Sequence, residues 1–172
     1  AVTTAPTSAL ATGGQDIPVI QKSVQYAPEG ASFVPLKVSR IAHKPLKNGK
    51  ITSLFGYRGK VNNGGEGFHQ GLDIAVEPGS PVAAMYFGVV REVGAGTGYG
   101  NYIRLYHGNG IEVLYAHCSQ ILADKGAVIR AGEIVAYSGS TGDSTGPHVH
   151  IEVTFHGIAY NPAGIVPVDY YD

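Results

Sequence analysis

The chain has 172 residues, with 12 Lys and Arg against 13 Asp and Glu, so its formal net charge is −1 at pH 7. This near balance gives no electrostatic case for binding nucleic acid or an anionic membrane surface, and no apolar run is long enough to span a bilayer. The length suits one domain with a sizeable core. The 25 glycines and 10 prolines predict many tight turns between short strands.

The first part of the chain differs in composition from the rest. Residues 1–14 are small and polar, which is typical of a flexible leader. Between residues 15 and 45, short β-like pieces such as IPVIQKSV and FVPLKVSRI are interrupted by proline. We therefore expect an N-terminal arm over 1–49 that is partly flexible and can pack on the main domain, a main domain over 50–166, and a short tail over 167–172.

From residue 50 onward, β-branched and aromatic segments follow one another, and most of them end in Gly or Asn-Gly. Examples are NYIRLYHG, IEVLYAHC and HVHIEVTFHG. A sustained helical period is missing from this region. The fold is therefore predicted to be mainly β, an antiparallel sheet with few or no helices, and with one short helical turn near residues 119–122.

Two histidines lie one residue apart in the segment HVHIEV. Because side chains alternate between the two faces of a strand, His148, His150 and Glu152 share one face and Val149 and Ile151 share the core face. Taken alone, this pattern is more simply explained as a solvated pair of histidines. A catalytic zinc site needs three protein ligands and an open position, so further ligands must come from elsewhere.

The segment FHQGLDIAV supplies His69 and Asp73. On a straight strand these residues would stand about 13 Å apart, too far to bind one ion. Gly71 between them permits a sharp bend, so a bent loop leading into a strand is the expected carrier.

The segment IEVLYAHCS ends an apolar strand with His117. Strict alternation places His117 on the same face as Val113 and Tyr115, and Cys118 on the opposite face. We expect Cys118 to be a packed thiol rather than a metal ligand.

The stretches HQGLD, YAH and GPHVH occur in this order, and together they resemble peptidase family M23, the lysostaphin-type zinc metallopeptidases of the bacterial cell wall. SLFGYRG and GYGNYIRLYHGNG support the resemblance, which covers residues 51–162. It implies a β-sheet domain of the barrel-sandwich type with a groove for an extended peptide.

The resemblance also implies roles for five side chains. His69, Asp73 and His150 would bind one zinc ion with a water in the fourth position. His117 and His148 would be the two catalytic histidines that do not bind zinc. One would act as general base and the other would stabilise the developing oxyanion, and the sequence does not assign these two roles.

The function implied is a zinc endopeptidase that hydrolyses peptide bonds in peptidoglycan stems or cross-bridges. We expect a monomer that is secreted or periplasmic and whose partners are peptidoglycan peptides. One alternative is a non-catalytic member of the same fold that activates cell-wall amidases. Another is a carrier or carbohydrate-binding β-domain, in which the five residues would be coincidental.

Several further residues carry open expectations. Glu152 could orient a ligand imidazole or be a solvated residue. Tyr57, Tyr99 and Tyr102 could line the groove. The N-terminal arm could lie over the groove or extend the sheet, and we expect a chain without residues 1–45 to fold and bind zinc.

Overall fold

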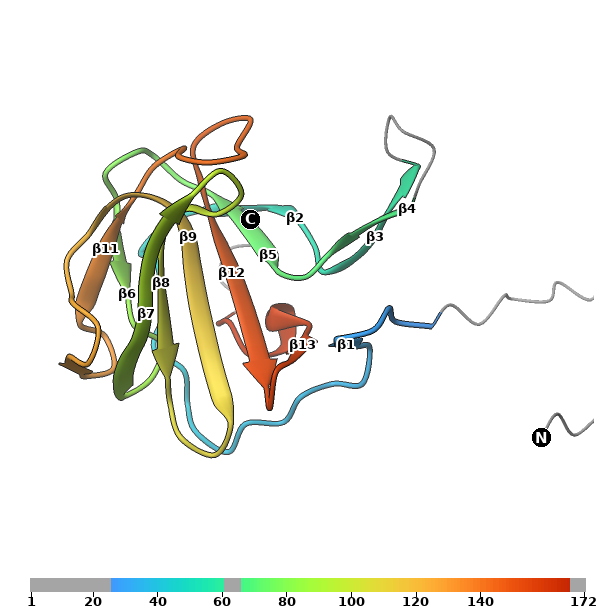
Figure 1. Ribbon diagram of the computed structural model, residues 1–172, viewed down its shortest axis with the longest axis horizontal. Coiled ribbons are helices and arrows are strands. Elements are labelled where there is room, and N and C mark those ends of the chain that lie inside the picture. The colour runs from blue at the N-terminus through green and yellow to red at the C-terminus, as the bar shows by residue number, and fades with distance from the viewer. Residues whose placement is uncertain (1–25, 61–65, 168–172) are drawn as a thin grey trace, which may run out of the picture.

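The computed structural model describes residues 26–60 and 66–167, which Figure 1 shows as a twisted β-sheet with connecting loops. The prediction of a mainly β protein is confirmed, since the described residues form strands and one short 3₁₀ helix, η1, at Pro162–Gly164. No helix in this part of the chain has the length and apolar character needed to cross a bilayer. The strands in chain order are β1 (Ala31–Ser32), β2 (Lys50–Ser53), β3 (Gly56–Lys60), β4 (Glu66–His69), β5 (Leu72–Ala75), β6 (Pro81–Ala83), β7 (Gly88–Gly96), β8 (Gly100–Tyr106), β9 (Ile111–Ile121), β10 (Val128–Ile129), β11 (Ile134–Ser138), β12 (His148–Phe155) and β13 (Ile158–Tyr160).

The helical turn expected near residues 119–122 is not formed. Strand β9 continues to Ile121, because β11 pairs with its end and brings Ala136 opposite Ile121. The neighbouring strand satisfies the backbone hydrogen-bonding groups that a helical turn would otherwise have paired.

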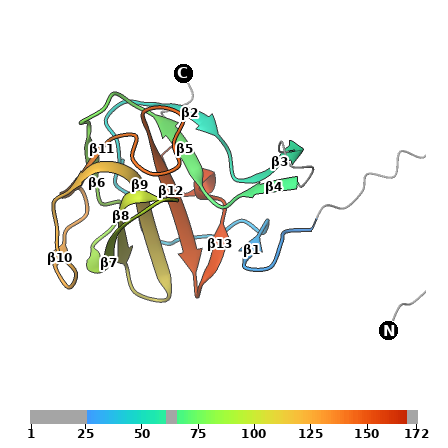
Figure 2. The same cartoon turned by 45° about the horizontal axis from the view of Figure 1, so that its top comes forward.

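Strand β12 lies in the middle of the sheet. β9 pairs antiparallel with it along one edge, and β5 and β13 pair with it along the other. From β9 the sheet continues through β8 and β7 to β10, while β11 joins β9 to β6. The β3–β4 hairpin forms a separate two-stranded sheet, which extends to one side in Figures 1 and 2. Because of its central place, a side chain on β12 can meet groups from both neighbouring strands.

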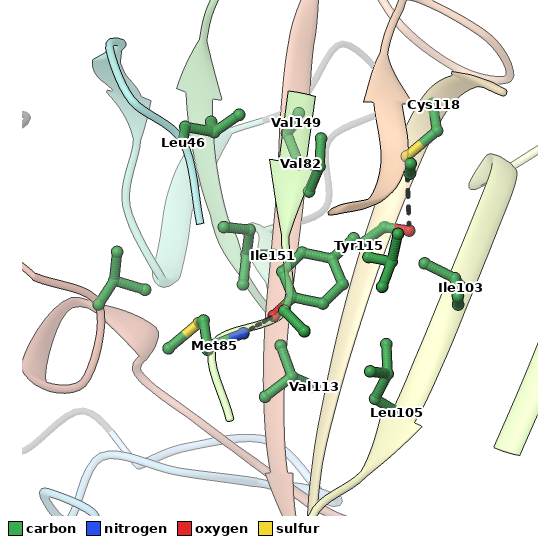
Figure 3. Packing of buried hydrophobic residues seen from close by; sticks show 14 of the residues in the cluster. Leu46, Val82, Met85, Ile103, Leu105, Val113, Tyr115, Cys118, Val149 and Ile151 are labelled. Carbon is green, nitrogen blue, oxygen red and sulfur yellow. Dashed lines mark hydrogen bonds between the residues drawn. The ribbon is translucent and has the colours of Figure 1, made fainter. Parts of the chain in front are cut away.

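The alternation expected along β12 is confirmed on its core face. Val149 and Ile151 are fully buried in the hydrophobic core, and Figure 3 shows Ile151 beside the Tyr115 ring and Val149 beside Val82. The Met85 backbone N–H donates a hydrogen bond to the Tyr115 hydroxyl, with 2.9 Å between the two heavy atoms. This pairing satisfies a backbone donor that would otherwise be buried at a cost.

The segment from residue 26 to 48 is part of the fold. β1 extends the sheet in parallel with β13, and Leu46 is buried in the core. The His43 N–H also donates to the Met85 carbonyl oxygen at 2.8 Å. The described part of the N-terminal arm therefore packs on the main domain. Deletion of residues 1–45 would remove β1 and the partly buried Leu36, Val38 and Ala42, which pack against the core. The expectation that the remaining chain folds and binds zinc stays a prediction.

An aromatic cluster joins this segment to the β3–β4 hairpin. The ring centroid of Phe33 lies 6.2 Å from that of Phe55, 6.2 Å from that of Tyr57 and 5.9 Å from that of Phe68. Phe68 in turn packs edge-on against Phe55 and Tyr57. Edge-to-face packing of this kind stabilises beyond the area that it buries, so the cluster fixes the hairpin against β1.

We predict that Phe33→Ala lowers the free energy of unfolding by about 1–2 kcal/mol, because a ring that is 43% exposed loses contact with three aromatic neighbours. Val34→Ala is the matched control. Its side chain is 69% exposed, so the change should stay within about 0.5 kcal/mol. Urea denaturation followed by circular dichroism measures both values, and equal effects of the two changes would contradict the role given to the cluster.

Candidate metal centre

Three side-chain atoms from two strands and a hairpin converge on one point. His69 Nε2 lies 3.1 Å from Asp73 Oδ1 and 3.1 Å from His150 Nδ1, and His150 Nδ1 lies 2.7 Å from Asp73 Oδ1. Ligands around a tetrahedral zinc ion stand about 3.3 Å apart. The three donors therefore have the identity and approximate spacing that one divalent ion requires.

The chain brings these residues together by a bend and by strand register. β4 ends at His69 and β5 begins at Leu72, so the bend expected around Gly71 is present. β5 then pairs with β12 so that Asp73 stands opposite His150. A Cβ atom on Gly71 would lie 2.6 Å from His150 Cε1. The glycine is needed here because there is no room for a side chain.

In both imidazoles, one ring nitrogen donates a hydrogen bond, and the other keeps a lone pair directed at the point where the three candidate ligand atoms converge. His69 Nδ1–H donates to the Leu54 carbonyl oxygen at 2.8 Å, which leaves Nε2 as an acceptor. His150 Nε2–H donates to Glu152 Oε1 at 3.1 Å, which leaves Nδ1 as an acceptor. Two acceptor nitrogens and a carboxylate oxygen in contact repel one another unless a cation or proton lies between them. This donor set therefore fits a metal ion.

Glu152 is held in place to orient His150. Its side chain is only 6% exposed, and Tyr99 donates its hydroxyl hydrogen to the same carboxylate oxygen at 2.6 Å. Burial by itself would raise the pKa of Glu152, but the hydrogen bonds from His150 and Tyr99 hold that pKa below its usual value. Of the two interpretations that the sequence left open, the geometry supports the orienting role.

Asp73 divides its two oxygens between different partners. Oδ1 faces the two imidazoles, whereas Oδ2 accepts a hydrogen bond from Arg58 Nη2 at 3.0 Å. Burial would raise the pKa of Asp73, but the hydrogen bonds and charges of His150 and His69 hold it well below its usual range. The carboxylate therefore remains charged. Arg58 was not predicted from the sequence, since its contact with Asp73 depends on the position of the β3–β4 hairpin beside the main sheet.

His117 and His148 lie beside the three candidate metal ligands, His69, Asp73 and His150. The rings of His117 and His148 are 4.6 Å apart between centroids, and His148 Nε2 lies 3.9 Å from Asp73 Oδ1. Each Nδ1–H donates to a backbone carbonyl oxygen at 2.8 Å, that of Thr141 for His117 and that of Gly146 for His148. Both rings are thereby fixed with Nε2 free for proton transfer.

A β-bulge determines where His117 points. Asn101 of β8 pairs with Cys118, and Ile103 pairs with Tyr115, so β9 carries one extra residue in this interval. His117 takes a φ of 59°, and Cys118 instead joins Tyr115 in the core. The prediction that His117 shares a face with Tyr115 is wrong, because the bulge interrupts alternation. The prediction of a packed thiol at Cys118 is confirmed.

The site opens into a cleft of about 400 Å³, whose lining includes His69, Asp73, His117, His148 and His150. A second hollow of about 370 Å³ continues from it, and both are lined by Arg58, Asp73, Thr145 and His148. Among the described residues, none before residue 50 lines either hollow. The described part of the N-terminal arm therefore does not cover the cleft, and any role of residues 1–25 lies outside the described residues.

The three tyrosines expected in the groove are in different places. Tyr99 lines the cleft. Tyr57 belongs to the aromatic cluster, and its hydroxyl donates to the Tyr26 carbonyl oxygen. Tyr102 packs on Tyr99 and donates to Glu92. Of the three, only Tyr99 is among the described residues around the cleft.

A family model for peptidase family M23 matches residues 67–162, which is more than half of the chain. This span contains the three convergent donors and both further histidines. The chain belongs to peptidase family M23.

Relatives and solved structures agree with this membership. The M23 chain is 42% identical over 122 residues to "DD-carboxypeptidase/endopeptidase Mpg" of Neisseria meningitidis serogroup B, covering 71% of this chain and 28% of that protein. A zinc-containing peptidase from Vibrio cholerae matches with a TM-score of 0.65 and 31% identity, over 76% of this chain and 40% of that one. The catalytic domain of lysostaphin from Staphylococcus simulans matches with a TM-score of 0.61 and 32% identity, over 69% and 92%. The M23 chain thus spans little more than a quarter of the Neisseria relative.

We predict that Gly71→Ala weakens zinc binding by roughly tenfold or more, because the new Cβ would displace the His150 ring. Gly96→Ala is the control, since a Cβ there would meet no other atom within 4 Å. Competition with a chromogenic chelator measures the affinity of each variant. Unchanged affinity in Gly71→Ala would show that the site tolerates a shift of that ring.

A second expectation concerns the carboxylate behind His150. Glu152→Gln should reduce zinc affinity by roughly 10–100-fold, because the amide no longer enforces the tautomer with a free Nδ1. Glu92→Gln provides a control, since Glu92 is an exposed surface carboxylate that also accepts from a tyrosine hydroxyl. The same competition assay serves both variants, and equal affinities would remove Glu152 from the support of the site.

Proposed function

We propose that this chain is a zinc endopeptidase that hydrolyses peptide bonds in peptidoglycan stems or cross-bridges. His69, Asp73 and His150 would hold the ion, with water in the fourth position. The observation that carries this proposal is the convergence of their three acceptor atoms within 3.1 Å of one another in an open cleft. A bound zinc ion would polarise the scissile carbonyl and lower the pKa of water.

The chain's own residues would then move the protons. His117 is the better general base, because burial lowers its pKa and its hydrogen bond to the Thr141 carbonyl only partly offsets this, so Nε2 is free to accept a proton at neutral pH. His148 Nε2 would donate a hydrogen bond to the oxyanion that develops on the scissile carbonyl. Both rings are held by backbone carbonyls, so little reorganisation accompanies the reaction.

The substrate class rests on family membership and on the open shape of the cleft. An extended peptide can enter a cleft that no described part of the N-terminal arm covers. The Neisseria relative is named a DD-carboxypeptidase/endopeptidase, which supports peptide hydrolysis. A Vibrio cholerae relative is named a peptidoglycan DD-endopeptidase, which supports peptidoglycan as the substrate. The proposal also includes that the protein acts in the cell envelope and that it is a monomer.

Digestion of purified sacculi tests this function directly. Zinc-loaded protein should release new muropeptides that mass spectrometry identifies, the chelated protein should release none, and added zinc should restore cleavage. A protein that binds zinc but leaves sacculi intact would instead support the scaffold alternative, in which the fold activates amidases.

Substitutions should separate zinc binding from chemistry. His69→Ala, Asp73→Ala and His150→Ala should each lose the ion. His117→Ala should keep zinc and lower kcat by at least about 100-fold, since it removes the proposed base. His43→Ala, at an exposed position away from the cleft, should change neither property. Zinc content by mass spectrometry and muropeptide release provide the two readouts, and loss of zinc in His117→Ala would refute the role given to it.

A further inference from the structure

Arg58 stands out among the residues around the cleft by its charge. Of the described side chains that line either hollow, it is the only lysine or arginine. The acids Asp73 and Asp143 line the same cleft. Apart from the proposed zinc ion, the Arg58 guanidinium is therefore the only permanent positive charge among these described side chains to which an anionic group of a substrate could bind.

The guanidinium has hydrogen-bonding capacity beyond its contact with Asp73. It carries five N–H donors in a planar fork, and Nη2 donates to Asp73 Oδ2 at 3.0 Å. The Arg58 side chain remains 45% exposed and lines both hollows where they meet. An arginine in this setting can hold a second carboxylate through two parallel hydrogen bonds.

The position of Arg58 beside the candidate metal centre indicates which carboxylate of a peptide substrate it can bind. Asp73 Oδ2 contacts Arg58, and Oδ1 of the same carboxylate contacts both imidazoles of the candidate metal centre. One carboxylate group thus separates the guanidinium from the reacting position. In a peptide, the α-carboxylate of the leaving residue is separated from the scissile nitrogen by a single carbon atom.

We infer that Arg58 binds the free α-carboxylate of the residue whose amine leaves, and this inference rests on the proposed function. In the reaction, water adds its oxygen to the carbonyl carbon, the C–N bond breaks and the amine leaves with the transferred proton. The substrate class is then any peptide bond whose leaving residue has a free α-carboxylate. A C-terminal residue qualifies, and so does a cross-link to the amine of a residue whose own α-carboxylate is free. A bond inside a longer peptide bridge does not.

The inference accounts for the two activities in the name of the Neisseria relative, a DD-carboxypeptidase/endopeptidase. The two reactions differ in what lies beyond the leaving residue, but they share the carboxylate next to the broken bond. A competing role for Arg58 is to position Asp73 only. In that case, its loss would reduce zinc binding or cleavage of every peptide to the same degree.

Two peptides distinguish these roles. The first ends in D-alanyl-D-alanine with a free carboxylate, and the second is its C-terminal amide. The zinc-loaded wild type should cleave the acid with kcat/KM about 10–100-fold above the amide, as expected for a charge-assisted hydrogen bond. In Arg58→Gln this ratio should fall to about 1, mainly through KM, and Arg58→Lys should keep part of it. Arg130→Gln, an exposed site outside the cleft, should match the wild type.

Binding provides a readout that is independent of turnover. In a His117→Ala background, calorimetry should show the acid binding more tightly than the amide, and the added Arg58→Gln change should remove that difference. Zinc content is measured for every variant. An equal preference for acid and amide in the wild type, or a parallel loss for both peptides in Arg58→Gln, would overturn the inference. Failure of the proposed function differs, since zinc-loaded wild type would then leave sacculi and both peptides uncleaved.

Discussion

The contact between two imidazole nitrogens and one carboxylate oxygen is the constraint on which the site depends. His69 Nε2 and His150 Nδ1 face each other at 3.1 Å, each with its other nitrogen committed to a hydrogen bond. Without an ion a proton must relieve this contact. Burial disfavours charge on His150, but the hydrogen bonds to Asp73 and Glu152 prevail and raise its pKa to about 9. Metal binding at this site would therefore displace a proton.

The surrounding structure holds the side chains of the site through locally unfavourable backbone conformations and close contacts. His117 has a positive φ, a conformation that costs on the order of 1–3 kcal/mol for a residue with a side chain. The bend at Gly71 brings backbone and ring atoms so close that no Cβ fits. These costs lie beside the fully buried face of β12. The core of the sheet thus supplies the stability that keeps a strained and polar cleft in one arrangement.

One part of the site rests outside the main sheet. His69 and Arg58 lie on the β3–β4 hairpin, which meets the N-terminal segment through the aromatic cluster around Phe33. Asp73 and His150 belong to paired strands of the main sheet. The candidate metal centre therefore joins two separately supported pieces, and both the N-terminal segment and the sheet contribute to its geometry.

Local alternation in the sequence predicted the mainly β fold and the core face of β12, and motifs that resemble peptidase family M23 pointed to the five residues around the cleft. The remaining features arise from contacts between distant segments. The bulge that turns His117 away from the core arises from pairing with β8, and the contact of Arg58 with Asp73 arises from the hairpin's position. Tyr57 was predicted for the groove and lies instead in the aromatic cluster. Such features depend on strand register and on packing between distant segments, which local sequence patterns do not encode.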